Sequence, residues 1–158
     1  MLKMIALVIS AFVLASCNTA SPMSSLSEPS PEQQLLSTKE GLSLVLEKDN
    51  YTESPLVIAT TITNDSIRDY GFGDYFYIEI NKEGKWYILT HSDAVFINNP
   101  QLNDFGHVLA AGEKVDMHFS IEDLGIELAP GEYRLVKTFL AQQQPYYEIS
   151  IAVPFSVD

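Results

Sequence analysis

Apolar and polar residues alternate with a period of two along most of the chain. The clearest stretch is KVDMHFSI, residues 114–121, in which every second residue is apolar. Because the side chains of a β-strand point alternately to its two faces, this pattern predicts strands with one buried and one solvated face. We expect seven such strands, at residues 42–47, 56–63, 75–80, 85–90, 114–121, 132–140 and 146–155. Residues 95–97 are a candidate for an eighth.

Turn-forming residues separate these segments, and no long stretch shows the 3.6-residue period of a helix. Pro130 and Gly131, for example, precede the strand at residues 132–140, where proline presets φ and glycine accepts a positive φ. The second strand is expected to bury three residues on one face, Leu56, Ile58 and Ile62. The predicted fold class is all-β, an antiparallel β-sandwich of about seven strands whose sheets are each solvated on one side.

The first seventeen residues have the features of an export signal with a lipid attachment site. Lys3 precedes an apolar stretch at residues 4–15, which as a helix would cover about 18 Å and is too short for a bilayer core of about 30 Å. Residues 14–17, LASC, resemble the lipobox of bacterial lipoproteins. This resemblance implies cleavage before Cys17, a diacylglycerol on its sulfur and an acyl chain such as palmitate on the new amino terminus. It also implies an exported protein anchored to the cell membrane or the outer membrane, with its domain outside the cytoplasm.

The composition changes after the cysteine. Residues 18–40 are rich in Ser, Pro, Thr and Gln and contain few large apolar residues, which predicts a flexible tether with an r.m.s. length of about 25 Å. The expected organisation is a signal peptide at residues 1–16, a lipidated tether at residues 17–40 and a β-sandwich domain at residues 41–158. Cys17 is the only cysteine, so an intramolecular disulfide is excluded.

The chain is acidic, with 9 Lys and Arg against 21 Asp and Glu and a formal net charge of −12. Such a surface repels phosphate backbones, so nucleic acid is not expected as a partner. The acidic residues are scattered singly, which is typical of a solvated exterior. The membrane, reached through the lipid, and an envelope protein are the partners that the sequence favours.

Four groups of residues near strand ends form short motifs. They are Thr63, Asn64 and Ser66; Gly84 and Trp86; Leu109, Gly112 and Glu113; and Leu128, Pro130, Gly131, Tyr133, Arg134, Leu135, Lys137 and Phe139. Their types and order resemble the bacterial immunoglobulin-like (Ig-like) domains of exported lipoproteins, from about Gly41 to the C-terminus. The resemblance implies an Ig-like sandwich. In such sandwiches a tyrosine at this corner hydrogen-bonds to the preceding loop, and we expect this of Tyr133, with Leu135 in the core.

Residues with catalytic or metal-binding chemistry do not form a recognisable pattern. The three histidines lack the spacing of metal ligands: His91, His107 and His118. His91, Ser92 and Asp93 are adjacent, but a catalytic triad is defined by spatial roles and no nucleophile-elbow motif is present. The one metal alternative is calcium at three aspartates near turns, without EF-hand spacing: Asp65, Asp69 and Asp74. We therefore expect no enzyme activity, no cofactor and no metal site.

Aromatic residues are dense between residues 70 and 87. One interpretation is that alternate members are core and the others cover a sheet face. The second is a partner surface made by the exposed members Tyr75, Tyr77 and Tyr87, because tyrosine offers rigid, amphipathic contact area.

The sequence thus favours a lipid-anchored, non-enzymatic envelope protein whose domain binds or scaffolds other proteins. The alternative is an Ig-like protease inhibitor that acts through the long loop at residues 90–107.

Overall fold

The computed structural model describes residues 23–91 and 105–158, and within these ranges every regular element is a β-strand. No helix of this part of the chain is long and apolar enough to cross a membrane. The predicted signal peptide, Cys17 and the candidate strand at residues 95–97 lie outside the described residues. The strands are β1 (Ser24–Ser25), β2 (Thr38–Lys39), β3 (Leu42–Leu46), β4 (Asn50–Tyr51), β5 (Val57–Asn64), β6 (Tyr70–Phe72), β7 (Tyr77–Lys82), β8 (Lys85–Thr90), β9 (His107–Leu109), β10 (Lys114–Ser120), β11 (Gly131–Ala141) and β12 (Glu148–Val157).

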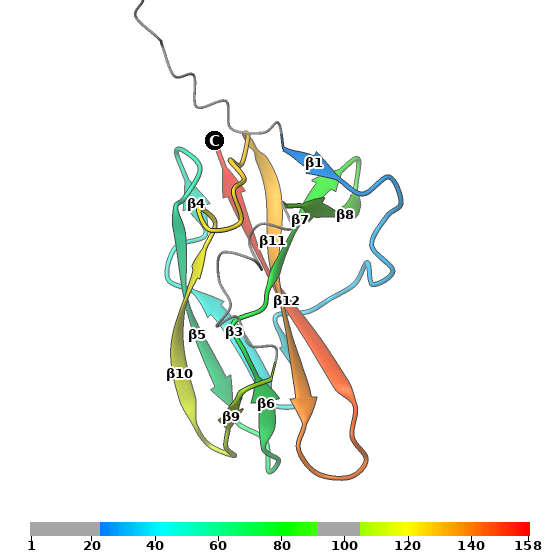
Figure 1. The fold of residues 1–158 in the computed structure, drawn as a ribbon, viewed down its shortest axis with the longest axis vertical. Coiled ribbons are helices and arrows are strands. Elements are labelled where there is room, and N and C mark those ends of the chain that lie inside the picture. Colours follow the sequence, from blue (N-terminus) through cyan, green and yellow to red (C-terminus); the bar gives the residue numbers. More distant parts are fainter. Residues whose placement is uncertain (1–22, 92–104) are drawn as a thin grey trace, which may run out of the picture.

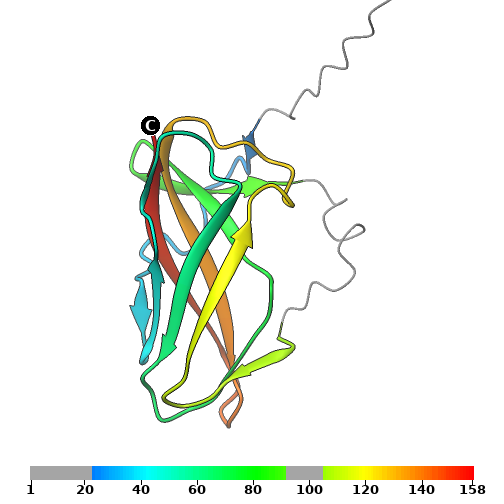
Figure 2. The same cartoon turned by 90° about the vertical axis from the view of Figure 1, so that its left-hand side faces the viewer.

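Two sheets face each other as the layers of a sandwich (Figures 1 and 2). The larger sheet has the order β1-β8-β7-β11-β12-β4, and β6 pairs with both β11 and β9. The smaller sheet has the order β10-β5-β3-β2. The ladders are antiparallel except that of β12 with β4, which is parallel. The predicted all-β antiparallel sandwich is confirmed.

The core lies between the two sheets and is built from alternate residues of their strands. Ile58 and Ile62 of β5 belong to the same core cluster as Leu135 and Phe139 of β11, and all four are fully buried. Burying an aliphatic or aromatic side chain of this size contributes about 1.5–3 kcal/mol. This core closes the sandwich without a disulfide between the described residues.

The seven predicted strands are present as β3, β5, β7, β8, β10, β11 and β12. Leu56 was expected on the buried face but is 65% exposed. It precedes β5, and its carbonyl accepts hydrogen bonds from Ile121 N (2.8 Å) and Glu122 N (3.2 Å) in the turn after β10. The strands β1, β2, β4, β6 and β9 were not predicted, because two or three residues are too few to show a period.

The tyrosine corner is formed as the sequence predicts. Tyr133 is fully buried near the start of β11, and its hydroxyl donates a hydrogen bond to the carbonyl of Ala129 at 2.5 Å. Burial raises the pKa of this phenol. Two residues further on, Leu135 is fully buried in the core. The hydrogen bond fixes the position of the loop that leads into β11, a central strand of the larger sheet.

The two ends of the sandwich carry different elements (Figure 1). The end with β1, the β7–β8 turn and the C-terminus is called here the amino-terminal end. The other, called the distal end, carries β6, β9 and the turn between β11 and β12. There the side-chain amide nitrogen of the buried Asn64 lies within hydrogen-bond distance of the carbonyls of Arg68 (2.7 Å), Leu109 (3.1 Å) and Ala110 (3.0 Å). Asn64, a residue of the predicted motifs, therefore holds two distal loops together.

Candidate functional site

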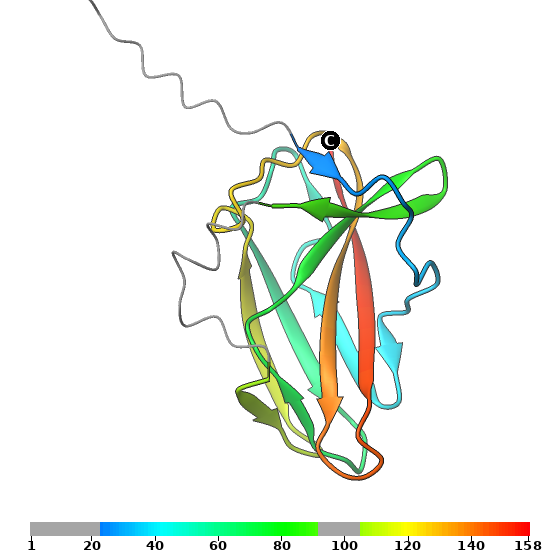
Figure 3. The same cartoon turned by 45° about the vertical axis from the view of Figure 1, so that its right-hand side comes forward.

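The outer face of the larger sheet, which points away from the smaller sheet, is the most distinctive surface of the molecule. A sandwich sheet usually exposes this face to water. Here residues 24–36, called the strap, run beside it and cover the half nearest the amino-terminal end (Figure 3). Glu79 of β7 and Arg134 of β11 lie under the strap and are almost wholly buried.

The strap is bonded along the edge of β8. Ser24 and Ser25 of β1 pair antiparallel with Thr90 and Leu89. Beyond them, the amide of Leu26 donates to the carbonyl of Ile88 at 2.9 Å, and that of Ser30 to the carbonyl of Trp86 at 2.8 Å. An uncovered edge strand offers its peptide groups to other chains, and the strap occupies this one.

Gln33 extends this edge pairing with its side chain. Its Nε2 donates to the carbonyl of Trp86 at 3.0 Å, and its Oε1 accepts from the amide of Trp86 at 2.9 Å. The same Nε2 lies 2.7 Å from the carbonyl of Ser30. The primary amide thus takes the place of a peptide group of a neighbouring strand.

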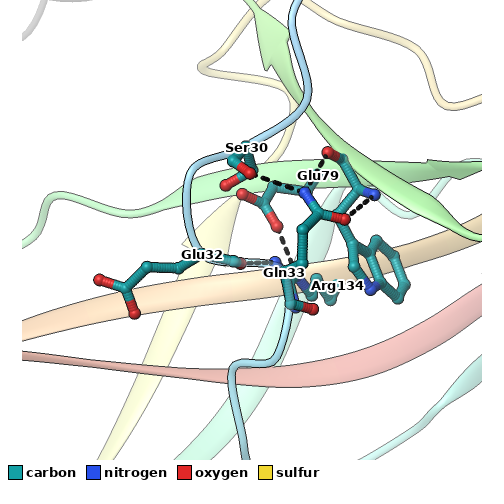
Figure 4. A network of polar contacts seen from close by, with 6 residues as sticks. Ser30, Glu32, Gln33, Glu79 and Arg134 are labelled. Carbon is teal, nitrogen blue, oxygen red and sulfur yellow. Dashed lines mark hydrogen bonds and ion pairs between the residues drawn. The ribbon is translucent and has the colours of Figure 1, made fainter.

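Arg134 ties the strap to the sheet (Figure 4). Its Nε donates to Glu79 Oε2, directly across the β11–β7 ladder, while its terminal nitrogens donate to the carbonyls of Gln33 (3.1 Å) and Glu32 (2.6 Å). The guanidinium carbon lies 4.7 Å from the ring centroid of Trp86. Planar arginine can make all these contacts at once, whereas lysine offers a single point charge. The arrangement is a structural clamp.

The strap corrects the prediction of a flexible tether at residues 17–40. Residues 23–40 contain β1, β2, the buried Ser30 and the bonds to Trp86 and Arg134. Their Ser, Pro and Gln content does suggest a flexible coil. These residues are ordered because their main-chain and side-chain polar groups bond to strands more than 50 residues away in sequence. Residues 17–22 lie outside the described residues.

The half of the outer face that the strap leaves open carries Tyr75 and Tyr77. Their ring centroids are 6.3 Å apart, and Tyr75 is 37% exposed. A hollow of about 190 Å³ beside them is lined by Tyr75, Phe105, Thr138 and Glu148. Burial, with the nearby charge of Glu79 as a smaller cause, raises the pKa of Tyr77 to about 12, so its phenol is neutral and a hydrogen-bond donor at physiological pH. We call Tyr75, Tyr77, Thr138 and Glu148 the open patch.

Tyr87, the third residue of the expected partner surface, is not part of this patch. It lies opposite Ile80 in the β7–β8 ladder, and directly opposed residues of an antiparallel pair share one side of the sheet. Ile80 is a core residue, and Tyr87 packs against the same core cluster. The structure therefore brings Tyr75 and Tyr77 together and puts Tyr87 on the inner side.

Lys137 has an unexpected position on β11. It alternates in phase with the core residues Leu135 and Phe139, and it is almost fully buried. Its ammonium donates to the carbonyls of Gly73 and Tyr75, the latter at 2.6 Å, and lies 5.9 Å from the ring centroid of Phe119. Lys137 thus holds the segment between β6 and β7 in place and positions the backbone of Tyr75. In the sequence, the signal for this supporting role is a lysine at a position where the alternation of β11 predicts a core residue.

The residues considered for catalysis or metal binding do not converge where the structure describes them. No group of three or more His, Cys, Asp or Glu in residues 23–91 and 105–158 could hold a metal ion. His118 is exposed on β10, as the alternation predicts, and the ring of His107 lies 5.5 Å from that of Phe72. Asp69 accepts a hydrogen bond from the amide of Ala111 at 2.9 Å, which is a loop contact.

The loop considered for protease inhibition, residues 90–107, is mostly undescribed, since residues 92–104 lie outside the described ranges. Its described ends, Thr90 in β8 and His107 in β9, belong to the larger sheet. No observation on the described residues favours this alternative.

Comparison with known proteins gives one informative result. A family model described as a bacterial Ig-like domain matches residues 38–153. No curated protein matches the chain. Among solved structures, a β-glucosidase from Erythrobacter marinus shows 18% sequence identity with a TM-score of 0.29. The match covers 71% of this chain and 15% of that protein, and a similarity of this size supports no conclusion about either fold or activity.

We expect Arg134→Met to lower the free energy of unfolding by about 3–5 kcal/mol, because it leaves the buried charge of Glu79 without its partner. The double variant with Glu79→Leu should recover a large part of this loss, since it removes both charges. Urea unfolding of the wild type, the two single variants and the double variant measures the coupling. Strictly additive losses would contradict a direct interaction.

Proposed function

Because this chain belongs to the bacterial Ig-like domain family, we propose that it is a lipid-anchored, non-enzymatic envelope protein whose β-sandwich binds or scaffolds other proteins. The observation that carries the binding part is the open patch. It is a pair of tyrosines on a sheet face that is otherwise covered by the protein's own strap. We propose that this protein acts by contact through that patch.

The open patch suits a protein partner for physical reasons. Tyr75 and Tyr77 present aromatic rings and hydroxyl groups with few rotatable bonds, and such residues carry much of the energy of protein interfaces. Lys137 holds the backbone of Tyr75 from below, so the ring is presented on a rigid support. Glu148 and the hydroxyl of Thr138, which bonds to Ser150 at 2.9 Å, supply polar groups at the rim.

The anchor is proposed from the leader sequence. Residues 14–17, LASC, follow a single positive charge and an apolar stretch, as in bacterial lipoproteins. One acyl chain binds a membrane only marginally, whereas two or three give stable attachment. A diacylglycerol on Cys17 and an acylated amino terminus would therefore hold the protein firmly at the cell membrane or the outer membrane.

We expect Cys17→Ser to abolish incorporation of labelled palmitate, because the variant lacks the sulfur that receives the lipid. Asn18→Ser is the matched control and should keep the label. The measurement is palmitate labelling in cells, followed by detergent phase separation. Equal labelling of the wild type and Cys17→Ser would rule out the anchor.

We expect the double variant Tyr75→Ser/Tyr77→Ser to lose crosslinking to its envelope partner by tenfold or more, since two interface tyrosines contribute about 2 kcal/mol or more. Tyr146→Ser, at an exposed tyrosine of the distal end, is the matched control and should retain the crosslinks. Crosslinking in intact cells with detergent pull-down measures the effect, after circular dichroism has shown that both variants fold. An unchanged crosslinking pattern in the double variant would disprove a binding role of the patch.

A further inference from the structure

Because of the strap, the chain joins the sandwich at its amino-terminal end, although β3 begins at the distal end. Gly41, which precedes β3, lies at the distal end, where its carbonyl accepts from the amide of Asp65 at 2.8 Å. Met23 lies at the amino-terminal end, where its sulfur lies 3.5 Å from the Tyr133 hydroxyl. Residues 23–41 therefore run along the length of the sandwich, and the chain leaves the described structure beside β1 (Figures 1 and 3).

The remaining link between Cys17 and the strap is short. Six peptide steps separate Cys17 from Met23, and at full extension they span about 22 Å. The sandwich is longer, because the eleven residues of β11 alone extend about 36 Å at about 3.3 Å per residue. A lipid at Cys17 therefore cannot hold the domain upright with its distal end on the membrane and its amino-terminal end away from it while the strap stays bound.

We propose that the strap fixes the orientation of the domain on a phospholipid bilayer: the amino-terminal end faces the lipid headgroups, and the distal end points away. This inference rests on the proposed lipid at Cys17. A tether free up to Gly41 would attach at the distal end and span about 80 Å when extended, which would allow every orientation. The strap removes that freedom through its bonds to β8 and Arg134.

Exposed apolar side chains occur at both ends of the sandwich, and Leu56 and Val57, where β5 begins, are among those near the amino-terminal end. The distal end carries three exposed apolar side chains in its loops and short strand: Ile67, Val108 and Tyr146. In the proposed orientation these residues are directed into the extracytoplasmic space, out of reach of the bilayer. At the other end, Lys82 Nζ donates to Ser25 Oγ at 2.6 Å and ties the β7–β8 turn to the strap close to the headgroups.

Short-range quenching by lipids tests the orientation on the full-length lipidated chain. Cys17 is the only cysteine and its sulfur would carry the lipid, so Glu83→Cys and Gln143→Cys each add one reactive thiol, at the amino-terminal and distal ends respectively. Each purified variant is labelled with a fluorophore and placed in phosphatidylcholine vesicles that contain a headgroup nitroxide lipid. We expect several-fold stronger quenching at position 83 than at position 143.

A matched control lengthens the link. Twenty Gly and Ser residues inserted between residues 22 and 23 bring its extended length to about 90 Å, so the two labels should be quenched almost equally. Equal or reversed quenching in vesicle-bound protein with the natural link would overturn the proposed orientation and leave the lipid anchor standing. Failure of the natural chain to bind the vesicles, together with absent palmitate labelling, would overturn both the anchor and the orientation.

Discussion

The arrangement of the outer face depends on the hydrogen bonds of the buried Arg134 guanidinium to Glu79 and to the strap. A buried charge is costly unless it is paired and its donors are satisfied. Glu79 supplies the opposite charge from the neighbouring strand, and the carbonyls of Gln33 and Glu32 each accept a hydrogen bond from one terminal nitrogen. Because two of these acceptors belong to the strap, the larger sheet and the amino-terminal segment stabilise one another. Removing the strap would expose this charged pair on the outer face and leave β8 as an uncovered edge strand.

This constraint divides the outer face into a structural half and an open half. Under the strap, the side chains of Glu79 and Arg134 are almost wholly buried. Beyond it, Tyr75 is exposed and Tyr77 is half-buried, and Lys137 supports the backbone of Tyr75 from the core. Arg134 and Lys137, the two cationic residues of the β11 motif, therefore each hold another segment in place by hydrogen bonds to its backbone carbonyls. Arg134 holds the segment that links the domain to its proposed anchor, and Lys137 holds the segment that carries the open patch.

Local patterns in the sequence were sufficient for the strands but not for the strap. The period of two identified the seven long strands, and the Pro-Gly turn with its tyrosine predicted the hydrogen bond of Tyr133, because both signals depend on neighbouring residues. The prediction for Leu56 was wrong because β5 begins one residue later than expected, which leaves Leu56 in the preceding loop. The order of residues 23–40 comes from partners such as Trp86, far away in sequence, and composition does not contain that information. The exclusion of Tyr87 from the patch likewise follows from strand register.

The amino-terminal segment from Ser24 to Leu36 is part of the folded domain and not a free tether. Hydrogen exchange at the backbone amides of Leu26, Ser30 and Trp86 is a sharp test of this arrangement, since each donates a hydrogen bond that exists only when the strap is bound. All three amides are expected to be protected and to lose protection together. Exchange of Leu26 and Ser30 at the rate of an unstructured peptide, while β11 stays protected, would contradict it.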